Sequence, residues 1–127
     1  MKEENGYSEP TKAQLEILQV LWKNGPSTVR FVNDRLNEQK EAVGYTSTLK
    51  LMQIMFEKGM LKRDDSNMTH IYSAALEEQK TKRVVLDKFV DSMYNGSVKE
   101  LMLELLGNEK TSHNDWETIK GLLNKME

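Results

Sequence analysis

The stretch 44–75 constrains the fold most strongly, because it joins a short helix to a β-ribbon. It opens with Gly44-Tyr-Thr-Ser-Thr-Leu-Lys50, which favours a helix that begins with small hydroxyl side chains. Gly59 then stands where a helix C-cap belongs. Beyond it lie two strand-like segments, 60–63 and 68–74, on either side of a turn at 64–67. The sequence therefore predicts a helix followed by an antiparallel β-hairpin.

Two more short amphipathic helices are predicted upstream, over residues 11–24 and 27–39. Thr11 and Gln14 fit a capping box at the start of the first. Gly25-Pro26 ends that helix, and Ser27 is expected to cap the second. The buried stripe of the second helix is expected to comprise Val29, Val32 and Leu36. Three helices followed by a ribbon predict a mainly α winged helix-turn-helix with a small antiparallel β wing.

From Leu76 onward the chain is rich in helix formers with apolar stripes, interrupted at Asn95-Gly96, and a last helix is expected to be capped near Ser112. A winged helix of about 75 residues can close its own core, so these extra apolar faces need another surface, most economically a second copy of the chain. We therefore expect a DNA-binding domain over 1–75 and a helical dimerisation domain over 76–127. The expected dimer contacts are Val85, Phe89, Leu101, Met102, Leu105, Trp116, Ile119, Leu122 and Leu123. Packing of the tail onto its own winged helix stays open as the alternative.

The composition excludes several classes of function. With 127 residues the chain can hold one domain, or a small domain with an appendage, but not a cleft built from several layers. It has no cysteine, so disulfides and thiolate metal sites are excluded. His70 and His113 lie far apart, and neither a cysteine nucleophile nor a Gly-rich phosphate loop is present. We expect no catalytic site, no metal site and no cofactor. No apolar run approaches the roughly 20 residues that cross a bilayer, and the expected location is cytoplasmic.

The third predicted helix is the expected reader of DNA bases. In a helix-turn-helix the N-terminal residues of the second helix of the pair reach base edges in the major groove. The expected base-reading residues are Tyr45, Thr46, Ser47 and Lys50, whose hydroxyl and ammonium groups suit base edges. A role of Thr46 and Ser47 as helix caps alone stays open. The expected phosphate contacts are Lys62 and Arg63 on the wing, with Lys12, Arg30 and His70 as further candidates.

The order and spacing of several segments resemble the penicillinase repressors, a family that includes β-lactamase and methicillin-resistance repressors. These segments are Glu16-Ile-Leu-Gln-Val-Leu-Trp22, Pro26-Ser-Thr-Val-Arg30 with Leu36, Gly44-Tyr-Thr-Ser-Thr-Leu-Lys-Leu-Met52, Glu57-Lys-Gly-Met-Leu61 and Tyr72-Ser-Ala74. The resemblance implies an N-terminal winged helix and a C-terminal helical dimerisation domain. It also implies a homodimer that binds a dyad-symmetric operator in double-stranded DNA and represses antibiotic resistance genes.

The resemblance further implies release of DNA by proteolysis. In such repressors a membrane sensor protease, acting directly or indirectly, leads to cleavage of an Asn-Phe bond in the dimerisation region. The corresponding position here is Glu104-Leu105. Two other positions depart from the family pattern: Ile54 replaces a frequent arginine, and Asn67-Met68 stands where a Gly-Arg pair is common. The copper-responsive branch carries a cysteine-rich motif that this chain lacks.

A function from another class stays open beside the repressor. Residues 1–75 carry ten basic and ten acidic side chains, and the whole chain has a formal charge of -2. Proteins that bind nucleic acid are often strongly basic. A winged helix that serves as a protein-protein interaction module, without sequence-specific DNA binding, would need no excess of positive charge.

Overall fold

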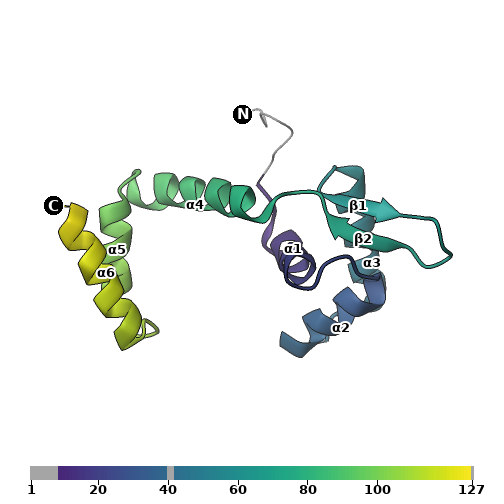
Figure 1. Ribbon diagram of the computed structural model, residues 1–127, viewed down its shortest axis with the longest axis horizontal. Helices are drawn as coiled ribbons and strands as arrows, with labels where there is room; N and C mark the ends of the chain where they lie inside the picture. The colour runs from purple at the N-terminus through teal and green to yellow at the C-terminus, as the bar shows by residue number, and fades with distance from the viewer. Residues whose placement is uncertain (1–8, 40–41, 127) are drawn as a thin grey trace. The chain divides into compact units, whose positions relative to one another are not determined.

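The computed structural model describes residues 9–39 and 42–126 (Figure 1). In this part of the chain it contains six helices and one two-stranded antiparallel sheet. The internal contacts separate two compact units, one reaching Lys82 and the other starting at Arg83. The fold is mainly helical and has the winged-helix order of elements followed by C-terminal helices, as the sequence predicts.

Helix α1 (Lys12–Asn24) begins and ends through local signals that can be read in the sequence. Thr11 accepts a hydrogen bond from the Gln14 N–H at 3.2 Å, and the Gln14 side chain accepts one from the Thr11 N–H at 2.9 Å. This confirms the predicted capping box. Gly25 follows the helix with a φ of 83°, a backbone conformation that glycine adopts without the steric cost of a Cβ. The helix therefore ends where Gly25-Pro26 predicts.

Helix α2 (Val29–Gln39) begins two residues later than the sequence suggests, and the prediction of Ser27 as its cap is wrong. The hydroxyl of Thr28 accepts the hydrogen bond from the Phe31 N–H at 3.1 Å. Ser27 instead pairs its backbone with Tyr72, through N–H to carbonyl bonds of 2.9 and 2.8 Å. Because Ser27 extends the sheet as an isolated bridge, its backbone is held outside the helix.

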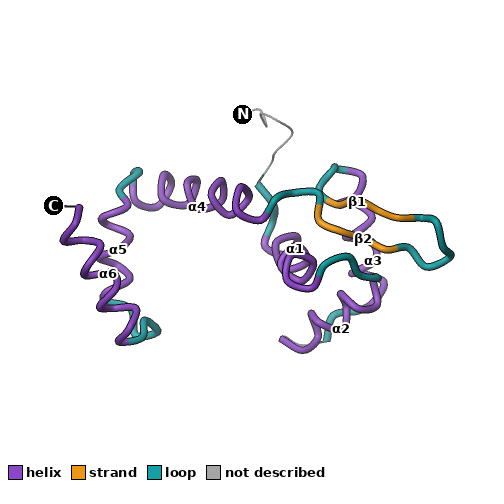
Figure 2. The backbone as a smooth tube through the Cα atoms, in the orientation of Figure 1, coloured by secondary structure: helices purple, strands orange, loops and turns teal. Residues whose placement is uncertain are grey.

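Helix α3 (Tyr45–Glu57) leads through Gly59 into strands β1 (Leu61–Asp64) and β2 (Ile71–Ala74). The strands pair in antiparallel register, with Leu61 opposite Ala74 and Asp64 opposite Ile71. The second strand is shorter than the predicted 68–74. Asp64 accepts hydrogen bonds from the N–H and the hydroxyl of Ser66, at 3.0 and 2.7 Å, and this turn diverts the chain from the ladder. Figure 2 shows the resulting long loop between the strands.

The core of the first unit lies between α1, α2, α3 and the hairpin. Leu18, Val32 and Met52 are completely buried, and Tyr72 brings the hairpin into the same cluster. The indole N–H of Trp22 donates to the carbonyl of Leu76 at 3.0 Å, which ties the chain after the hairpin to α1. This packing fixes α3 and the hairpin with respect to α1 and α2.

The second unit is built from the C-terminal helices. Helix α4 (Glu78–Tyr94) runs into it, and α5 (Val98–Leu106) and α6 (His113–Met126) lie side by side (Figures 1 and 2). Asn95 and Gly96 have positive φ values of 51° and 83°, which confirms the predicted interruption. The Ser112 hydroxyl accepts from the Asp115 N–H at 3.1 Å, as its predicted cap role requires. No helix among the described residues is long and apolar enough to span a membrane.

Candidate nucleic-acid interface

The first turns of α3 form an exposed polar face. The side chains expected to read bases, Tyr45, Thr46, Ser47 and Lys50, are all exposed. Gly44 is the N-cap of this helix, and no side chain makes a capping hydrogen bond there. The hydroxyls of Thr46 and Ser47 therefore do not act as the helix cap, which was the alternative explanation for them. This end of α3 therefore carries two exposed residues with hydroxyl groups.

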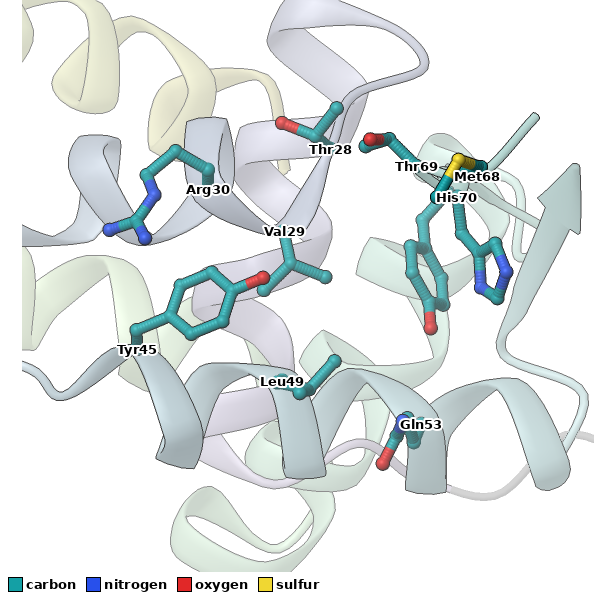
Figure 3. A pocket seen from close by; sticks show the side chains of 10 residues that line it. Thr28, Val29, Arg30, Tyr45, Leu49, Gln53, Met68, Thr69 and His70 are labelled. Carbon is teal, nitrogen blue, oxygen red and sulfur yellow. The ribbon is translucent and has the colours of Figure 1, made fainter. Parts of the chain in front are cut away.

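Arg30 and Tyr45 meet across the junction of α2 and α3. The guanidinium carbon of Arg30 lies 4.4 Å from the centre of the Tyr45 ring (Figure 3). Such a stacked guanidinium is attracted to the ring face and keeps N–H groups at its edge free to donate to an anion. The sequence assigned Tyr45 to bases and Arg30 to phosphates. The structure brings them together as one pair.

A cavity of about 370 Å³ separates α3 from the hairpin loop. Val29, Leu49 and Tyr72 contribute apolar surface to its lining. Figure 3 shows Leu49 and Gln53 along α3, with Met68, Thr69 and His70 on the hairpin side. The predicted contacts Arg30, Tyr45 and His70 thus lie around one concave surface, whereas Lys12 does not line it. Thr28 and Thr69 also line the cavity and were not predicted.

Arg63 is held by contacts within its own unit. Its Nε lies 2.7 Å from Oδ1 of Asp65, and its guanidinium carbon lies 4.1 Å from the centre of the Phe56 ring. Hydrogen bonds to Tyr72 and then to Asp65 raise the pKa of Arg63 above its ordinary value. The Arg63 side chain is 23% exposed. A guanidinium in this setting orients the wing against α3 and retains only part of its edge for an outside partner.

Lys62 and Arg63 lie on opposite faces of the hairpin. Successive side chains of a strand alternate between the two faces, and cross-strand partners share a face. Arg63 pairs with Tyr72, which is buried against the core, and Lys62 pairs with Ser73 on the other face. The two residues expected to anchor the wing are therefore not equivalent. Lys62 is exposed and Arg63 faces α3.

The hairpin loop carries acidic and apolar side chains toward solvent. Asp65 lies 3.5 Å from Nδ1 of His70 as well as beside Arg63. Hydrogen bonds from the Ser66 hydroxyl and N–H lower the pKa of Asp64. Met68 is fully exposed. The carboxylates of Asp64 and Asp65 would repel a DNA phosphate that approaches this loop. The wing is therefore not a uniformly basic ribbon.

The comparison with known proteins decides the family. The family model of the penicillinase repressor matches residues 10–125.

The chain belongs to the penicillinase repressor family.

This penicillinase repressor family member has distant relatives of nearly the same length. It is 23% identical over 122 residues to the methicillin resistance regulatory protein MecI of Staphylococcus aureus strain N315, covering 96% of this chain and 98% of MecI. It is 22% identical over 120 residues to a penicillinase repressor of Staphylococcus aureus, covering 94% of each chain. With a penicillinase repressor of Bacillus licheniformis it shares 25% identity over 101 residues, which cover 79% of this chain and 77% of the relative. The chain is thus a transcriptional repressor and not an enzyme, and membership implies operator binding and dimerisation.

The expected dimer contacts of this repressor differ in exposure. Leu123 is buried in its own chain, in the unit where α5 and α6 pack together. Phe89, Leu105 and Leu122 are exposed. The others are half-buried, namely Val85, Leu101, Met102, Trp116 and Ile119. Only the exposed and half-buried members offer apolar surface to a partner chain.

Glu104 and Leu105 are both exposed and lie in the last turn of α5, which ends at Leu106. The bond between them is part of a regular helix. Among the described residues no group of three or more His, Asp or Glu side chains could hold a metal ion.

One buried residue that matters for α3 escaped the sequence reasoning. Asn33 lies on the buried face of α2, together with Val29, Val32 and Leu36. It is four residues after Val29 and three before Leu36, so a polar residue inside the apolar stripe was the available signal.

Proposed function

We propose that this family member binds dyad-symmetric operator DNA as a homodimer and represses antibiotic resistance genes. The observation that carries the proposal is the exposed polar side chains in the first two turns of α3, where Thr46 and Ser47 have no capping role and Lys50 follows one turn later. In a helix-turn-helix this end of the helix enters the major groove. The hydroxyls then hydrogen-bond base edges, and Lys50 donates to guanine O6 and N7 or to a phosphate.

Arg30 and Lys62 are the better supported phosphate contacts. Both are exposed, and Arg30 is oriented by its stacking on Tyr45. Tyr45 then acts mainly as the platform for Arg30, with its hydroxyl beside the bases. Arg63, His70 and Lys12 remain proposed contacts of a weaker kind, because Asp65 engages the first two and Lys12 lies outside the cavity lining. Phosphate contacts fix the register of the protein on DNA without reading its sequence.

Dimerisation through the C-terminal helices is supported by their unpaired apolar side chains. The exposed large apolar residues of α4, α5 and α6 are Leu86, Phe89, Met93, Val98, Leu103, Leu105, Leu122 and Met126. Exposed apolar side chains that gather into a large surface mark interaction sites, and a second copy of the chain offers a surface to cover them. Linking two winged helices raises operator affinity, since binding of the second half-site becomes intramolecular.

Control of resistance genes and release by proteolysis are extensions from the relatives. The relatives are named for methicillin resistance and for the repression of penicillinase. Cleavage at Glu104-Leu105 would cut α5 in its last turn and break the chain between α5 and α6, which pack on each other. Separation of α6 from the rest of the chain would weaken the dimer and release the operator, with a membrane sensor protease as the proposed source of the signal.

Binding-site selection from random duplexes tests the proposal. The selected duplex is then titrated against a scrambled duplex at several salt concentrations. We expect a dyad-symmetric winner and, for some 3 to 5 phosphates per half-site, a log-log salt slope on the order of -5 to -9. A triple variant Thr46→Ala, Ser47→Ala, Lys50→Ala should lose the preference for the winner, while Lys110→Ala, in the turn between α5 and α6, should keep it.

The protein-interaction module is the competing function, and the acidic hairpin loop favours it. Its two carboxylates and the exposed Met68 suit a protein surface better than a phosphate chain. Failure to enrich any site, with weak binding that ignores sequence, would transfer support to this function.

A further inference from the structure

We propose that Asn33 is a positioning residue that sets the orientation of the recognition helix α3 on the operator. The inference rests on the proposed function, because it assigns a role within operator reading. Asn33 belongs to α2 and is 4% exposed, so it does not itself reach DNA. It acts through the chain that leads into α3.

The Asn33 amide joins α2 to both sides of the start of α3. Its Nδ2 donates to the carbonyl of Val43 at 2.9 Å and to the hydroxyl of Thr48 at 2.8 Å. A backbone carbonyl can only accept a hydrogen bond, so the contact with Val43 fixes which end of the amide carries the nitrogen. Both donors of the Asn33 amide are then used, and the bonds fix the direction of the side chain.

Asn37, one turn further along α2, completes the arrangement. It donates to Oδ1 of Asn33 at 3.3 Å and to the carbonyl of Val43 at 3.3 Å, and it accepts from the Val43 N–H. The N–H and the carbonyl of Val43 are therefore both bound by side chains of α2. The segment before α3 is held by directional bonds, whereas apolar contacts would leave it free to slide.

Thr48 passes this constraint to the helix. It is 2% exposed, its N–H donates to the carbonyl of Gly44 at 3.2 Å, and its hydroxyl lies within 3.4 Å of the same carbonyl. Val43 and Thr48 enclose the first turn of α3, which carries Thr46 and Ser47. Fixing both ends of that turn fixes the direction in which the Cα–Cβ bonds of these two residues leave the helix.

A buried asparagine is a poor choice for stability alone. An apolar side chain at this place in the stripe would bury more apolar surface and would have no polar group to satisfy. Hydrogen bonds restrict direction, which apolar packing does not. Base contacts require side chains held to within about 0.5 Å of their productive geometry. The arrangement suits the control of geometry, and geometry matters most where α3 reads DNA.

Four single variants of the full chain, and one double variant, test the inference. Asn33→Ala removes the amide, and Thr48→Val removes one acceptor while preserving the shape of the side chain. Thr48→Ser keeps the hydroxyl and is the conservative control. Val32→Ala truncates the neighbouring buried residue of α2 and is the control for simple loss of packing. Each is titrated with the selected operator and a scrambled duplex, at a temperature where circular dichroism shows the folded state.

Asn33→Ala and Thr48→Val should lower the ratio of operator to scrambled affinity about tenfold, the effect of one misplaced base contact. Scrambled affinity should change less than about twofold, because phosphate contacts carry it. Thr48→Ser and Val32→Ala should keep the wild-type ratio. The double variant Asn33→Ala, Thr48→Val should lose little more than the single variants, since the two residues share one hydrogen bond.

A second readout needs no DNA. In Asn33→Ala, hydrogen exchange of the Thr48 amide should accelerate more than exchange of the amides of α1. In Val32→Ala, exchange of the Thr48 amide and of the α1 amides should accelerate to the same extent. An unchanged affinity ratio in Asn33→Ala and Thr48→Val, or an equal loss in Val32→Ala, would overturn the positioning role. A wild-type chain that binds operator and scrambled duplex equally would instead overturn the proposed function, and the role of Asn33 with it.

Discussion

At the scale of single residues, Arg63 differs most from a simple basic contact. Its guanidinium lies between the Phe56 ring and the Asp65 carboxylate, and Tyr72 adds a further hydrogen bond. Asp65 also faces His70. The carboxylate therefore orders the wing and at the same time places a negative charge where DNA phosphates are proposed to lie. These two effects act on DNA affinity in opposite directions.

The charge should dominate, because exposed ion pairs contribute only about 0–1 kcal/mol. We expect Asp65→Asn to tighten binding to operator and scrambled duplexes alike, about threefold at low salt, with little change in stability. Fluorescence anisotropy at two salt concentrations measures this effect. Asp115→Asn on α6 removes the same charge outside the proposed interface and should leave the affinity unchanged. Weaker binding by Asp65→Asn would show that the ordering of Arg63 matters more than the charge.

Asp64 should titrate below its ordinary pKa of 3.8. Hydrogen bonds from Ser66 stabilise its charged form, so they stabilise the folded state above that pH and lose this effect as the pH falls through the lowered pKa. Carboxyl NMR titration measures the value directly. In Ser66→Ala the pKa should move back toward 3.8, while the remaining backbone bond keeps part of the shift. A Ser66→Ala titration identical to that of the wild type would contradict the assigned cause.

At the scale of elements, local signals determine where α3 ends and the hairpin begins. Gly59 follows the C-cap residue Lys58 with a φ of 84°, and its N–H donates to the carbonyl of Phe56 at 3.1 Å. A Cβ at this position would meet no atom within 4 Å, so only the backbone conformation disfavours another residue. Gly121, inside α6, also has open space around a Cβ but no positive φ.

These two glycines predict opposite changes in stability. Gly59→Ala should lower the free energy of unfolding by about 1 kcal/mol, the cost of a left-handed alanine. Gly121→Ala should raise it by about 0.5–1 kcal/mol, because alanine is the better helix former. Urea denaturation at one fixed protein concentration measures both. If both variants were destabilised equally, backbone conformation would not be the cause.

The elements also show what sequence reasoning can and cannot reach. Thr11 with Gln14 and the Asn95-Gly96 interruption depend on neighbours in the chain, and both were predicted correctly. Ser27 was assigned wrongly, because its backbone pairs with Tyr72 in a hairpin far along the sequence. In the candidate site too, features set by neighbours in the sequence could be predicted, and features set by distant residues could not. Exposed residues of α3 could be named from helix periodicity, but the contacts of Arg63 and the hydrogen bonds of Asn33 to Val43 and Thr48 depend on the tertiary structure.

At the scale of the whole molecule, the C-terminal helices are proposed to set the oligomeric state. Their exposed apolar side chains can serve a partner chain, whereas Leu123 already serves its own unit. The exposed and buried members of the predicted set should therefore respond differently to a charge. A charge at an exposed position should prevent dimerisation, whereas a charge at a buried position should impair folding.

We expect Phe89→Asp with Leu122→Asp to give folded monomers. Dimerisation would have to bury the two new charges, and this opposes association. Binding of the palindromic operator should weaken about a hundredfold or more, as the second half-site no longer binds intramolecularly. Sedimentation velocity and circular dichroism check these expectations. Leu123→Asp should instead reduce helicity. A double variant that still sediments as a dimer would move the interface away from Phe89 and Leu122.

The exposed apolar side chains on α5 and α6 have a consequence for the timing of induction. When the chain concentration lies below the dissociation constant of the dimer, mass action makes the abundance of a repressor that needs two intact chains fall with the square of the concentration of intact chains. Cutting half of the chains at Glu104-Leu105 would then leave roughly a quarter of the original dimers. A modest amount of proteolysis would then cause a larger loss of repression. Newly made chains would restore repression only after they had dimerised.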